Sequence, residues 1–525
     1  MTSRKSTGEV AKEESPKTGS VNEMRTSSFS IFDLYTSSGQ ITFILVIAAI
    51  AVLIQTLPKD FLSRIELDSQ ADLKSDRNEV KVTMPPTIVR PKYIIYNPRS
   101  KTHDHLVHVK EVLDRINFSW TNESNEWDLM WAHDYPFLKL PDLRTEMKSH
   151  QRINHFPGSG FITNKVDLAL TESDYIPKAF RLPQDADKFQ EYAKKHPDKE
   201  FVQKHNQHRH IYLKTISDID TSDNDTFIQE YMSNPLLVDG KKFDIGAYVV
   251  VTSVNPLRIY VYSGDYLLRF CPEEYNPFDR TNLDKYVVGD DYTPIWQMPS
   301  LKEYHDLGFS MMDSLNAHLQ SLGRDPSVIW DQIHDSIREV LLKKEKVLTD
   351  TIQRFKYKRN FFELMRFDFI LDENLRIFLL EANMSPNLSS AHFKPNRLLY
   401  EQVIYNTLGL VGIALGVKRE SLRPRDSATE AMMSSMKNIA INAQACSTDT
   451  CHMSCDPAEC LFCRSCLSTD DLNILHTAFR EHMNRGDMRR IFPLASSNDY
   501  TLSPRNLFMS HWFAQKCQKD STFCS

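Results

Sequence analysis

Two apolar runs, "RFDFIL" at residues 366–371 and "RIFLLEANM" at residues 376–384, are separated by the short polar segment "DENL". This arrangement predicts an antiparallel β-hairpin, because strands of this length joined by so short a connection pair with each other. Side chains alternate across a strand, so Glu381 and Asn383 share one face. The hairpin also brings Asp368 opposite or close beside them, and three oxygen-bearing side chains are therefore expected to converge.

These three side chains are typical of a magnesium site. Mg²⁺ prefers hard oxygen ligands, keeps several waters and is often completed by the phosphates of a substrate. Asp368, Glu381 and Asn383 are therefore candidate metal ligands. The alternative is a sheet edge at which the carboxylates simply face water, which explains one acidic residue more easily than a matched set.

A second polar stripe lies upstream in "KKFDIGAY", residues 241–248. Alternation places Lys242, Asp244 and Gly246 on one face of a predicted strand, with apolar residues on the other. A lysine suits a phosphate and a carboxylate suits a ribose hydroxyl or another donor, so the stripe is a candidate nucleotide clamp. An exposed sheet face would give the same alternation.

Extended and helical patterns alternate over residues 91–415, for example "LRIYVYSGDYLLRF" at 257–270 and a helical pattern at 330–355. This order predicts an α/β or α+β enzyme-like core. A chain of 525 residues that is 41% hydrophobic has ample material for such a core. Its net charge of -6 argues against a chain that coats nucleic acid, and no nucleic-acid partner is expected.

The N-terminal part differs in composition from this core. Residues 1–40 are polar and lack apolar periodicity, which predicts a disordered tail. Residues 41–57, "ITFILVIAAIAVLIQTL", carry no charge and no polar stripe, so we expect a single uncleaved transmembrane anchor and hence a membrane partner. Residues 58–90 are expected to be a linker.

The charges beside this anchor predict its orientation. Residues 21–40 contain one basic residue, Arg25, whereas residues 58–77 contain four basic residues. By the positive-inside rule, the large C-terminal part is expected to be cytosolic.

The cysteines point the other way. A polar linker is expected at residues 416–440, and eight of the nine cysteines lie in the Cys-rich region that follows, residues 441–525. An even, clustered set favours disulfides formed in an oxidising compartment. The alternative is a zinc site built from Cys460, Cys463 and Cys466 with His452. Cys271, which lies apart, is expected to be a small core residue.

Several segments, taken in order, resemble the tubulin tyrosine ligase-like family. They are "WDLMW" (127–131), "INHFPGSGFITNKVDLA" (153–169), "FRLP" (180–183), "FVQK" (201–204), "IQEYMSNPLLVDGKKFDIGAYVVV" (228–251), "LRIYVYSGDYLLRF" (257–270) and "FDFILDENLRIFLLEANMSPNL" (367–388). The resemblance covers residues 90–412, and collinear motifs over such a length are more specific than any single one. The polyglutamylases, which add glutamate, are the branch that the chain resembles most.

The resemblance implies an ATP-grasp core that uses ATP and Mg²⁺. It assigns the metal to Asp368, Glu381 and Asn383, and it places Arg269 near the transferring phosphate or the incoming amino acid. It assigns ATP to residues of three further segments: Lys204, Gln229, Glu230, Tyr231, Met232, Lys242 and Asp244. In this assignment the segment from Gln229 to Met232 lines the adenine through its backbone.

The resemblance also implies a reaction and its partners. ATP would convert a glutamate side chain of tubulin to an acyl phosphate, and the amine of free glutamate would displace the phosphate to give an isopeptide bond. Acidic tubulin tails would need a basic surface, for which residues 343–346 and 354–359 are candidates. The alternative for these two segments is a solvated helix face.

Two departures from the family pattern weaken the expected site. Residues 203–213, "QKHNQHRHIYL", contain no glycine where family members have a Gly-rich loop. Gly246 stands where family members carry an arginine, so one phosphate-facing cation is expected to be missing. The activity is therefore expected to be impaired, and the rival function is a membrane-anchored pseudoenzyme that acts as a binding or scaffold protein.

Overall fold

The computed structural model describes residues 90–525 apart from 101, 103, 206–210, 225, 415–430 and 496–500. The predicted disordered tail, the predicted anchor at 41–57 and nearly all of the first linker lie outside these residues, as do most of the second linker and the middle of the glycine-free loop. Within the described part of the chain, no helix is both long enough and apolar enough to span a bilayer.

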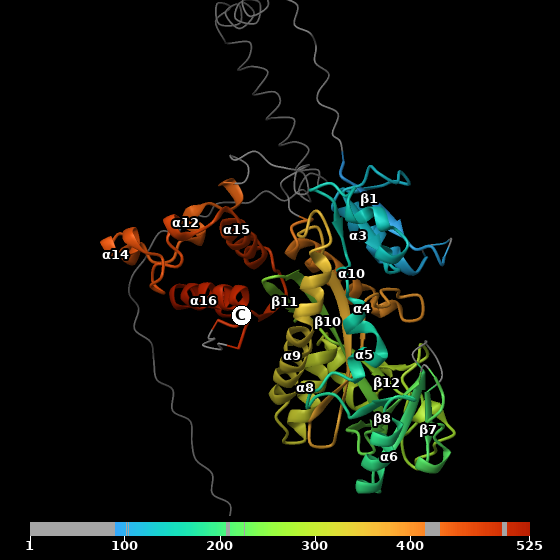
Figure 1. The fold of residues 1–525 in the computed structure, drawn as a ribbon. Helices are drawn as coiled ribbons and strands as arrows, with labels where there is room; N and C mark the ends of the chain where they lie inside the picture. The colour runs from blue at the N-terminus through green and yellow to red at the C-terminus, as the bar shows by residue number, and fades with distance from the viewer. Residues whose placement is uncertain are drawn as a thin grey trace, which may run out of the picture. The chain divides into compact units, whose positions relative to one another are not determined.

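The largest sheet is built around one long strand, β10 (Lys241–Val254) (Figure 1). On one side β10 pairs with β14 (Glu363–Leu371), and on the other it pairs with β11 (Leu257–Tyr262) and β12 (Leu267–Phe270), all antiparallel. β15 (Ile377–Asn383) pairs with β14 and completes the hairpin that the sequence predicts.

Shorter elements fix where β10 begins and extend the sheet. β9 (Leu237–Val238) turns into β10 through Asp239 and Gly240, whose φ angles of 48° and 75° give the turn geometry that suits a two-residue hairpin. β13 (Thr293–Pro294) pairs with β12, and β16 (Met488–Phe492) pairs with β11. Lys242 is thus held as the second residue after a tight turn.

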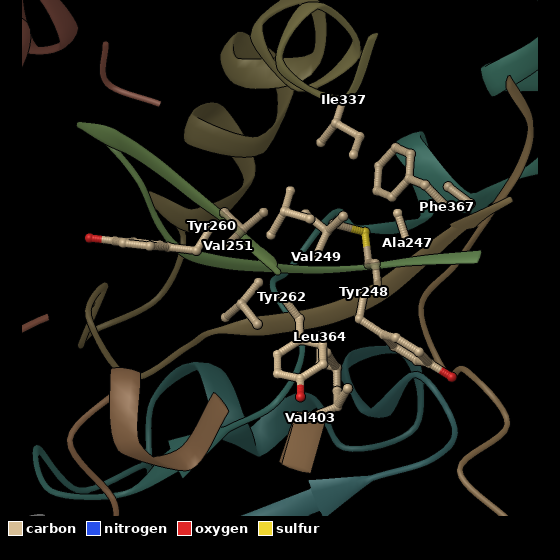
Figure 2. Close-up of a cluster of buried hydrophobic side chains, with 14 of the residues drawn as sticks. Ala247, Tyr248, Val249, Val251, Tyr260, Tyr262, Ile337, Leu364, Phe367 and Val403 are labelled. Carbon is tan, nitrogen blue, oxygen red and sulfur yellow. The ribbon is translucent and has the colours of Figure 1, made fainter. Parts of the chain in front are cut away.

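Both faces of this sheet are covered by helices (Figure 2). Ile337 of α9 (Ser327–Ile352) packs on one face, and Val403 of α10 (Arg397–Leu410) packs on the other. Burial on both faces explains why β10 and β11 read as nearly continuous apolar runs, "AYVVV" and "LRIYVY". The helical pattern at 330–355 is confirmed as α9.

Two smaller sheets complete the fold. A parallel sheet near the N-terminus has the order β2 (Ser119–Trp120), β1 (Lys92–Tyr96), β3 (Leu129–Ala132) and β4 (Arg152–Ile153). An antiparallel sheet has the order β5 (Ala179–Arg181), β8 (Thr226–Tyr231), β6 (Glu200–His205) and β7 (Ile211–Lys214). The mixed α/β class predicted from the sequence is confirmed.

Further helices connect these sheets: α3 (Val107–Arg115), α4 (Gly160–Thr163), α5 (Lys165–Ala169), α6 (Ala186–Lys195), α7 (Pro299–Asp306) and α8 (Met311–Ser321). α5 begins where Asn164 caps it, because the Asn164 Oδ1 accepts the backbone N–H groups of Val166 (3.0 Å) and Asp167 (3.1 Å). The cap fixes the first helical residue, Lys165, close to β15.

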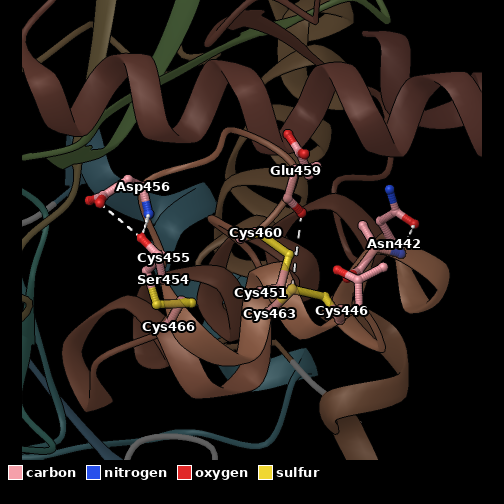
Figure 3. Close-up of a disulfide and its surroundings, with 12 residues drawn as sticks. Asn442, Cys446, Cys451, Ser454, Cys455, Asp456, Glu459, Cys460, Cys463 and Cys466 are labelled. Carbon is pink, nitrogen blue, oxygen red and sulfur yellow. Dashed lines mark hydrogen bonds between the residues drawn. A yellow bond between two sulfur atoms is a disulfide. The ribbon is translucent and has the colours of Figure 1, made fainter.

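The Cys-rich region contains four disulfides. Three of them, Cys446–Cys463, Cys451–Cys460 and Cys455–Cys466, appear in Figure 3, and the fourth is Cys517–Cys524. The disulfide prediction is confirmed, and the zinc alternative is wrong because all three of its cysteines are disulfide-bonded. Cys271 is free and buried, as expected for a core residue.

Helices surround these disulfides and join the region to the body: α12 (Met436–Ile439), α13 (Ala443–Cys446), α14 (Asp449–Met453), α15 (Thr469–Met483) and α16 (Pro504–Lys519). Glu481 of α15 accepts two hydrogen bonds from the guanidinium of Arg258 on β11, at 2.7 and 3.0 Å, and both side chains are buried. With β16 in the central sheet, the Cys-rich region is bound directly to the body.

Candidate active site

The hairpin of β14 and β15 gathers the three predicted metal ligands. Asp368 lies directly opposite Glu381 in the strand register. The Asn383 amide donates to Asp368 Oδ2 and to Glu381 Oε1, each at 3.1 Å. Asp368 is only 1% exposed, so the alternative of carboxylates that simply face water is wrong for this residue. The predicted convergence is confirmed.

Two arginines engage the carboxylate of Asp368. Arg366 donates from Nε to Oδ1 (2.6 Å) and from Nη2 to Oδ2 (2.8 Å), and Arg269 donates from Nη2 to Oδ2 (3.1 Å). Burial disfavours ionisation of Asp368, but the two guanidiniums outweigh it and lower the pKa of this carboxyl. A carboxylate that is ionised at neutral pH is what a metal ligand requires.

The second polar stripe is also buried, so the alternative of an exposed sheet face is wrong. Lys242 is 4% and Asp244 is 5% exposed. Arg269 donates two hydrogen bonds to the Asp244 carboxylate, from Nε to Oδ1 at 2.9 Å and from Nη2 to Oδ2 at 2.7 Å. Burial raises the pKa of Asp244, Arg269 opposes this shift, and the nearby Asp368 adds to it. Arg269 therefore bridges the two predicted stripes.

Two lysines approach from strands of different sheets, Lys204 from β6 and Lys242 from β10. Lys204 Nζ donates to Gln229 Oε1 at 2.7 Å, and Lys242 Nζ lies 4.9 Å from the centroid of the Tyr231 ring. Burial lowers the pKa of Lys204 to about 8, and the charge of Lys165 adds to this effect. Burial likewise lowers the pKa of Lys242 to about 8. Both ammonium groups would be stabilised by an anion.

The residues at the end of β8 divide between its two faces by strand alternation. Gln229 and Tyr231 face the two lysines, whereas the side chain of Glu230 points the other way and pairs with Tyr192 (3.0 Å) and Lys199 on the far side of β8. Met232 follows directly after the strand. Only the backbone of Glu230 is left for a ligand on the lysine side, and its N–H already donates to the Lys178 carbonyl.

Two residues of the site were not predicted from the sequence. Lys165 Nζ lies 3.7 Å from Glu381 Oε2, and Arg366 holds Asp368. Arg366 lies two residues before Asp368 on the same strand, so the alternation rule could have placed both on one face. Lys165 carries no comparable signal, because only the packing of α5 against β15 brings it to Glu381.

Gly246 lies beside this network and is paired with Asp368 across the strands. A Cβ atom at position 246 would come within 2.9 Å of Arg366 Cδ and 3.3 Å of Arg366 Nε. The φ angle of Gly246 does not lie in the left-handed region. The glycine is therefore required for space and not for an unusual backbone conformation, and a guanidinium fills the volume that faces it.

A cavity of about 600 Å³ opens beside Asn383. Its lining includes Arg99, His105 and His133 from the N-terminal part and Ser385 from the loop after β15. Burial lowers the pKa of His133 to about 4, and the neighbouring His105 adds to this shift, so its imidazole is neutral at pH 7. The cavity joins the carboxylate cluster to the N-terminal sheet.

Another group with metal-binding side chains fits a metal less well. His108, Glu111 and Glu401 place their ligand atoms within 4.8 Å of one another. Glu401, however, already pairs with Arg115 at 2.6 Å and with Arg397 at 3.6 Å. These guanidiniums supply the positive charge that an ion would bring, and they show that Glu401 is not a free surface carboxylate.

The basic segments expected to attract an acidic substrate are largely engaged. Lys343 pairs with Glu339 (2.5 Å), Lys346 pairs with Asp350 (2.8 Å), and Arg359 pairs with Asp470. Lys344 donates to a backbone carbonyl of α5 at 2.9 Å. For residues 343–346 on α9, these contacts favour the alternative, a solvated helix face whose charges are locally balanced, whereas residues 354–359 follow the end of that helix.

The fold and the site together define a mixed α/β protein with a buried carboxylate cluster surrounded by cations. The model of the tubulin-tyrosine ligase family matches residues 143–420. A probable tubulin polyglutamylase of Caenorhabditis elegans is 42% identical over 450 residues, which cover 83% of this chain and 87% of that protein. The chain therefore belongs to the tubulin-tyrosine ligase family.

Two vertebrate relatives are more distant. A tubulin polyglutamylase of Danio rerio is 29% identical over 332 residues, or 59% of this chain and 42% of that protein. A human tubulin monoglutamylase is 27% identical over 452 residues, or 77% of this chain and 36% of that protein. The matched part of the chain thus spans less than half of these two proteins.

Proposed function

We propose that this protein is an ATP- and Mg²⁺-dependent ligase that adds glutamate to glutamate side chains of tubulin. The observation that carries the proposal is the buried cluster of Asp368, Glu381 and Asn383, which converges on one point and is flanked by cations from α5, β12 and β14. The names of the relatives, which are tubulin glutamylases, support the acceptor and the amino acid.

The donor set of the cluster suits the proposed metal. Two carboxylates and one amide supply hard oxygen ligands, and Asp368 Oδ1 accepts a single hydrogen bond from the residues described, from Arg366. The Asn383 amide now turns its nitrogen towards both carboxylates, and rotation about its last bond would present the oxygen instead. Bound Mg²⁺ would stabilise the charge that develops on the phosphoryl oxygens.

The lysines are placed for the nucleotide. Lys204 and Lys242 would meet phosphate oxygens, and Gln229 and Tyr231 would line the base together with the backbone near Met232. Arg269, held by Asp244, would stabilise the charge that builds up as phosphate leaves the acyl phosphate. The lysines lose solvation by burial, so an anion that restores favourable contacts binds them strongly.

The cavity beside Asn383 is the proposed entrance for the acceptor side chain and the free amino acid. It opens next to the carboxylate cluster, and its polar lining includes the cation Arg99. The amine of the incoming glutamate must lose a proton before it attacks the acyl phosphate. The neutral imidazole of His133, whose pKa is lowered to about 4, adds no second positive charge to that of Arg99 in this cavity.

The experiment is an assay of the full chain in detergent with ATP, Mg²⁺, free glutamate and tubulin. Mass spectrometry should find added glutamates on tubulin, and the variant Glu381→Gln should add about 100-fold fewer. If the wild-type chain binds Mg²⁺–ATP but modifies no tubulin, the proposed tubulin acceptor is wrong. If the chain binds no nucleotide at all, the alternative of a pseudoenzyme is correct and the ligase proposal fails.

We also propose a single-pass membrane protein with a cytosolic body, on the basis of the charges that flank residues 41–57. A tubulin acceptor requires this orientation. The four disulfides oppose it, because they are typical of oxidising compartments. In sealed microsomes, protease should digest a C-terminal tag. Protection of the tag, with glycans on the exposed Asn117 or Asn122, would overturn both the orientation and the tubulin acceptor.

A further inference from the structure

Gly246 and Arg366 face each other across two strands. β10 and β14 are antiparallel, with Gly246 opposite Asp368 and Tyr248 opposite Arg366. Arg366 is therefore the diagonal neighbour of Gly246 on the face that carries Asp244 and Asp368. A Cβ atom on Gly246 would lie only 2.9 Å from Arg366 Cδ, a distance that would force the arginine to move.

The arginine uses this space to hold a carboxylate. Its guanidinium makes two hydrogen bonds to Asp368, at 2.6 and 2.8 Å, in the bidentate geometry that fixes both partners. Arg366 is only 6% exposed, so the interaction is formed away from water. Without the arginine, Asp368 would keep one guanidinium, that of Arg269.

The local charges are also balanced by this arginine. Asp244 and Asp368 contribute two negative charges, and Arg269 and Arg366 contribute two positive charges. A carboxylate buried this deeply needs charged partners that also satisfy its oxygen atoms. Arg366 therefore balances the charge of Asp368 and fixes its orientation.

We propose that Arg366 is a positioning residue for the metal ligand Asp368 and that Gly246 and Arg366 are a matched pair. The guanidinium expected at position 246 is supplied from position 366, and the glycine provides the space for it. This inference rests on the proposed ligase function for its effect on ATP. The pairing itself is a property of the fold.

The pairing reverses a simple expectation from the sequence. If Gly246 were a lost cation, Gly246→Arg would strengthen ATP binding. In the structure the new side chain would collide with Arg366 and would bring a third guanidinium beside Arg269. We expect Gly246→Arg to weaken Mg²⁺–ATP binding at least about tenfold and to lower the thermal midpoint.

The test is a double-mutant cycle on the full chain with Gly246→Arg, Arg366→Gly and the exchange of both residues. Each protein is measured for thermal midpoint and for Mg²⁺–ATP binding by calorimetry. We expect both single variants to lose binding and stability and the exchange variant to recover both, with binding within about threefold of the wild type.

Two milder variants keep the test decisive if Gly246→Arg does not fold. Gly246→Ala adds only the Cβ atom, and Arg366→Lys keeps the charge but loses the bidentate grip. Arg366→Lys should raise the Mg²⁺ concentration needed for ATP binding at an almost unchanged midpoint. Arg354→Lys, at an exposed arginine after α9, is the matched control and should change neither quantity.

The possible results separate the two proposals. If the exchange is no better than the sum of the single changes in both measurements, the matched pair is wrong. If stability returns but Mg²⁺–ATP binding does not, Arg366 does not position Asp368. If the wild type binds no nucleotide, the ligase function fails, while the stability cycle still decides whether the two residues are paired.

Discussion

The body of the chain, residues 90–414, and the Cys-rich region, residues 441–525, are stabilised by different means. The body has one large apolar core on both faces of its central sheet, and its cysteine, Cys271, is free. The Cys-rich region has a small core around Trp512 and four disulfides. A region with little apolar surface to bury gains stability from covalent links, as small domains do.

The difference also concerns where buried charge is placed. In the body, one group of buried charges lies at the candidate active site, where the side chains hold one another in position. In the Cys-rich region, the buried Glu481 instead forms an ion pair with Arg258 of the body. The candidate active site and the disulfides therefore lie in different regions. Loss of a disulfide should change ligand binding little, and a change in the site should affect the stability of the Cys-rich region little.

The largest expected effect comes from breaking the contact between the two regions. Glu481→Gln leaves Arg258 buried beside a neutral partner, and loss of one partner from such a pair typically costs about 3–5 kcal/mol. Chemical denaturation should show this loss. Asp470→Asn is the control, because the exposed pairs of Asp470 with Arg359 and Arg505 are each worth about 1 kcal/mol or less. Equal losses in the two variants would contradict the buried contact.

The next effect is removal of one disulfide. The Cys446–Cys463 bond spans 17 residues, and replacing both cysteines by alanine should cost the Cys-rich region about 3 kcal/mol, mainly through the freedom gained by the unfolded chain. The same change at Cys517–Cys524, which spans 7 residues, should cost somewhat less, about 2.5 kcal/mol. Denaturation followed by fluorescence measures both losses.

Mg²⁺–ATP binding is the readout that sharpens the comparison in these disulfide variants. It should stay unchanged, because the candidate site lies wholly in the body. A parallel fall in nucleotide affinity would show that the two regions are coupled and that the separation is wrong.

A metal ligand should show the reverse pattern. Glu381→Gln keeps the shape of the side chain but removes the charge, and we expect a loss of activity of about 100-fold, equivalent to about 2.7 kcal/mol, with an unchanged thermal midpoint. Glu303→Gln on α7, an exposed carboxylate, should have no effect on either quantity. Glu401 would be a poor control, because it pairs with Arg115 and Arg397. Unchanged Mg²⁺–ATP binding in the Glu381→Gln variant would show that Glu381 is not a metal ligand.

The smallest effect is a pH dependence of nucleotide affinity. The pKa values of Lys204 and Lys242 are lowered to about 8, so both lysines lose their charge as the pH rises through 8. ATP affinity should fall by up to about tenfold for each lysine between pH 7 and 9. Lys204→Arg stays charged over this range and should flatten part of the decline.

Stability should respond to the same titration with the opposite sign. The folded pKa values lie below the unfolded value of 10.5, so the unfolded chain binds more protons between pH 8 and 10.5. The free energy of unfolding therefore rises over this window as far as these two lysines contribute. A fall of both affinity and lysine-dependent stability above pH 8 would contradict the lowered pKa values.

Much of the site could be read from local patterns. Strand alternation placed Glu381 with Asn383 and Lys242 with Asp244, and the hairpin brought Asp368 to Glu381. The spacing and number of the cysteines favoured disulfides. These predictions succeeded because strand alternation and short turns are local properties, fixed by backbone geometry whatever the rest of the chain does.

Other features were decided only by the tertiary structure. The sequence marks Gly246 as a missing cation, but the pairing of β10 with β14 puts Arg366 into that space. Lys165 reaches Glu381 only because α5 packs on β15, and Glu481 finds Arg258 from 223 positions away in the chain. The sequence by itself determined which side chains share a strand face. Packing decided which charges meet, because a buried charge takes its partner from whatever element lies across from it.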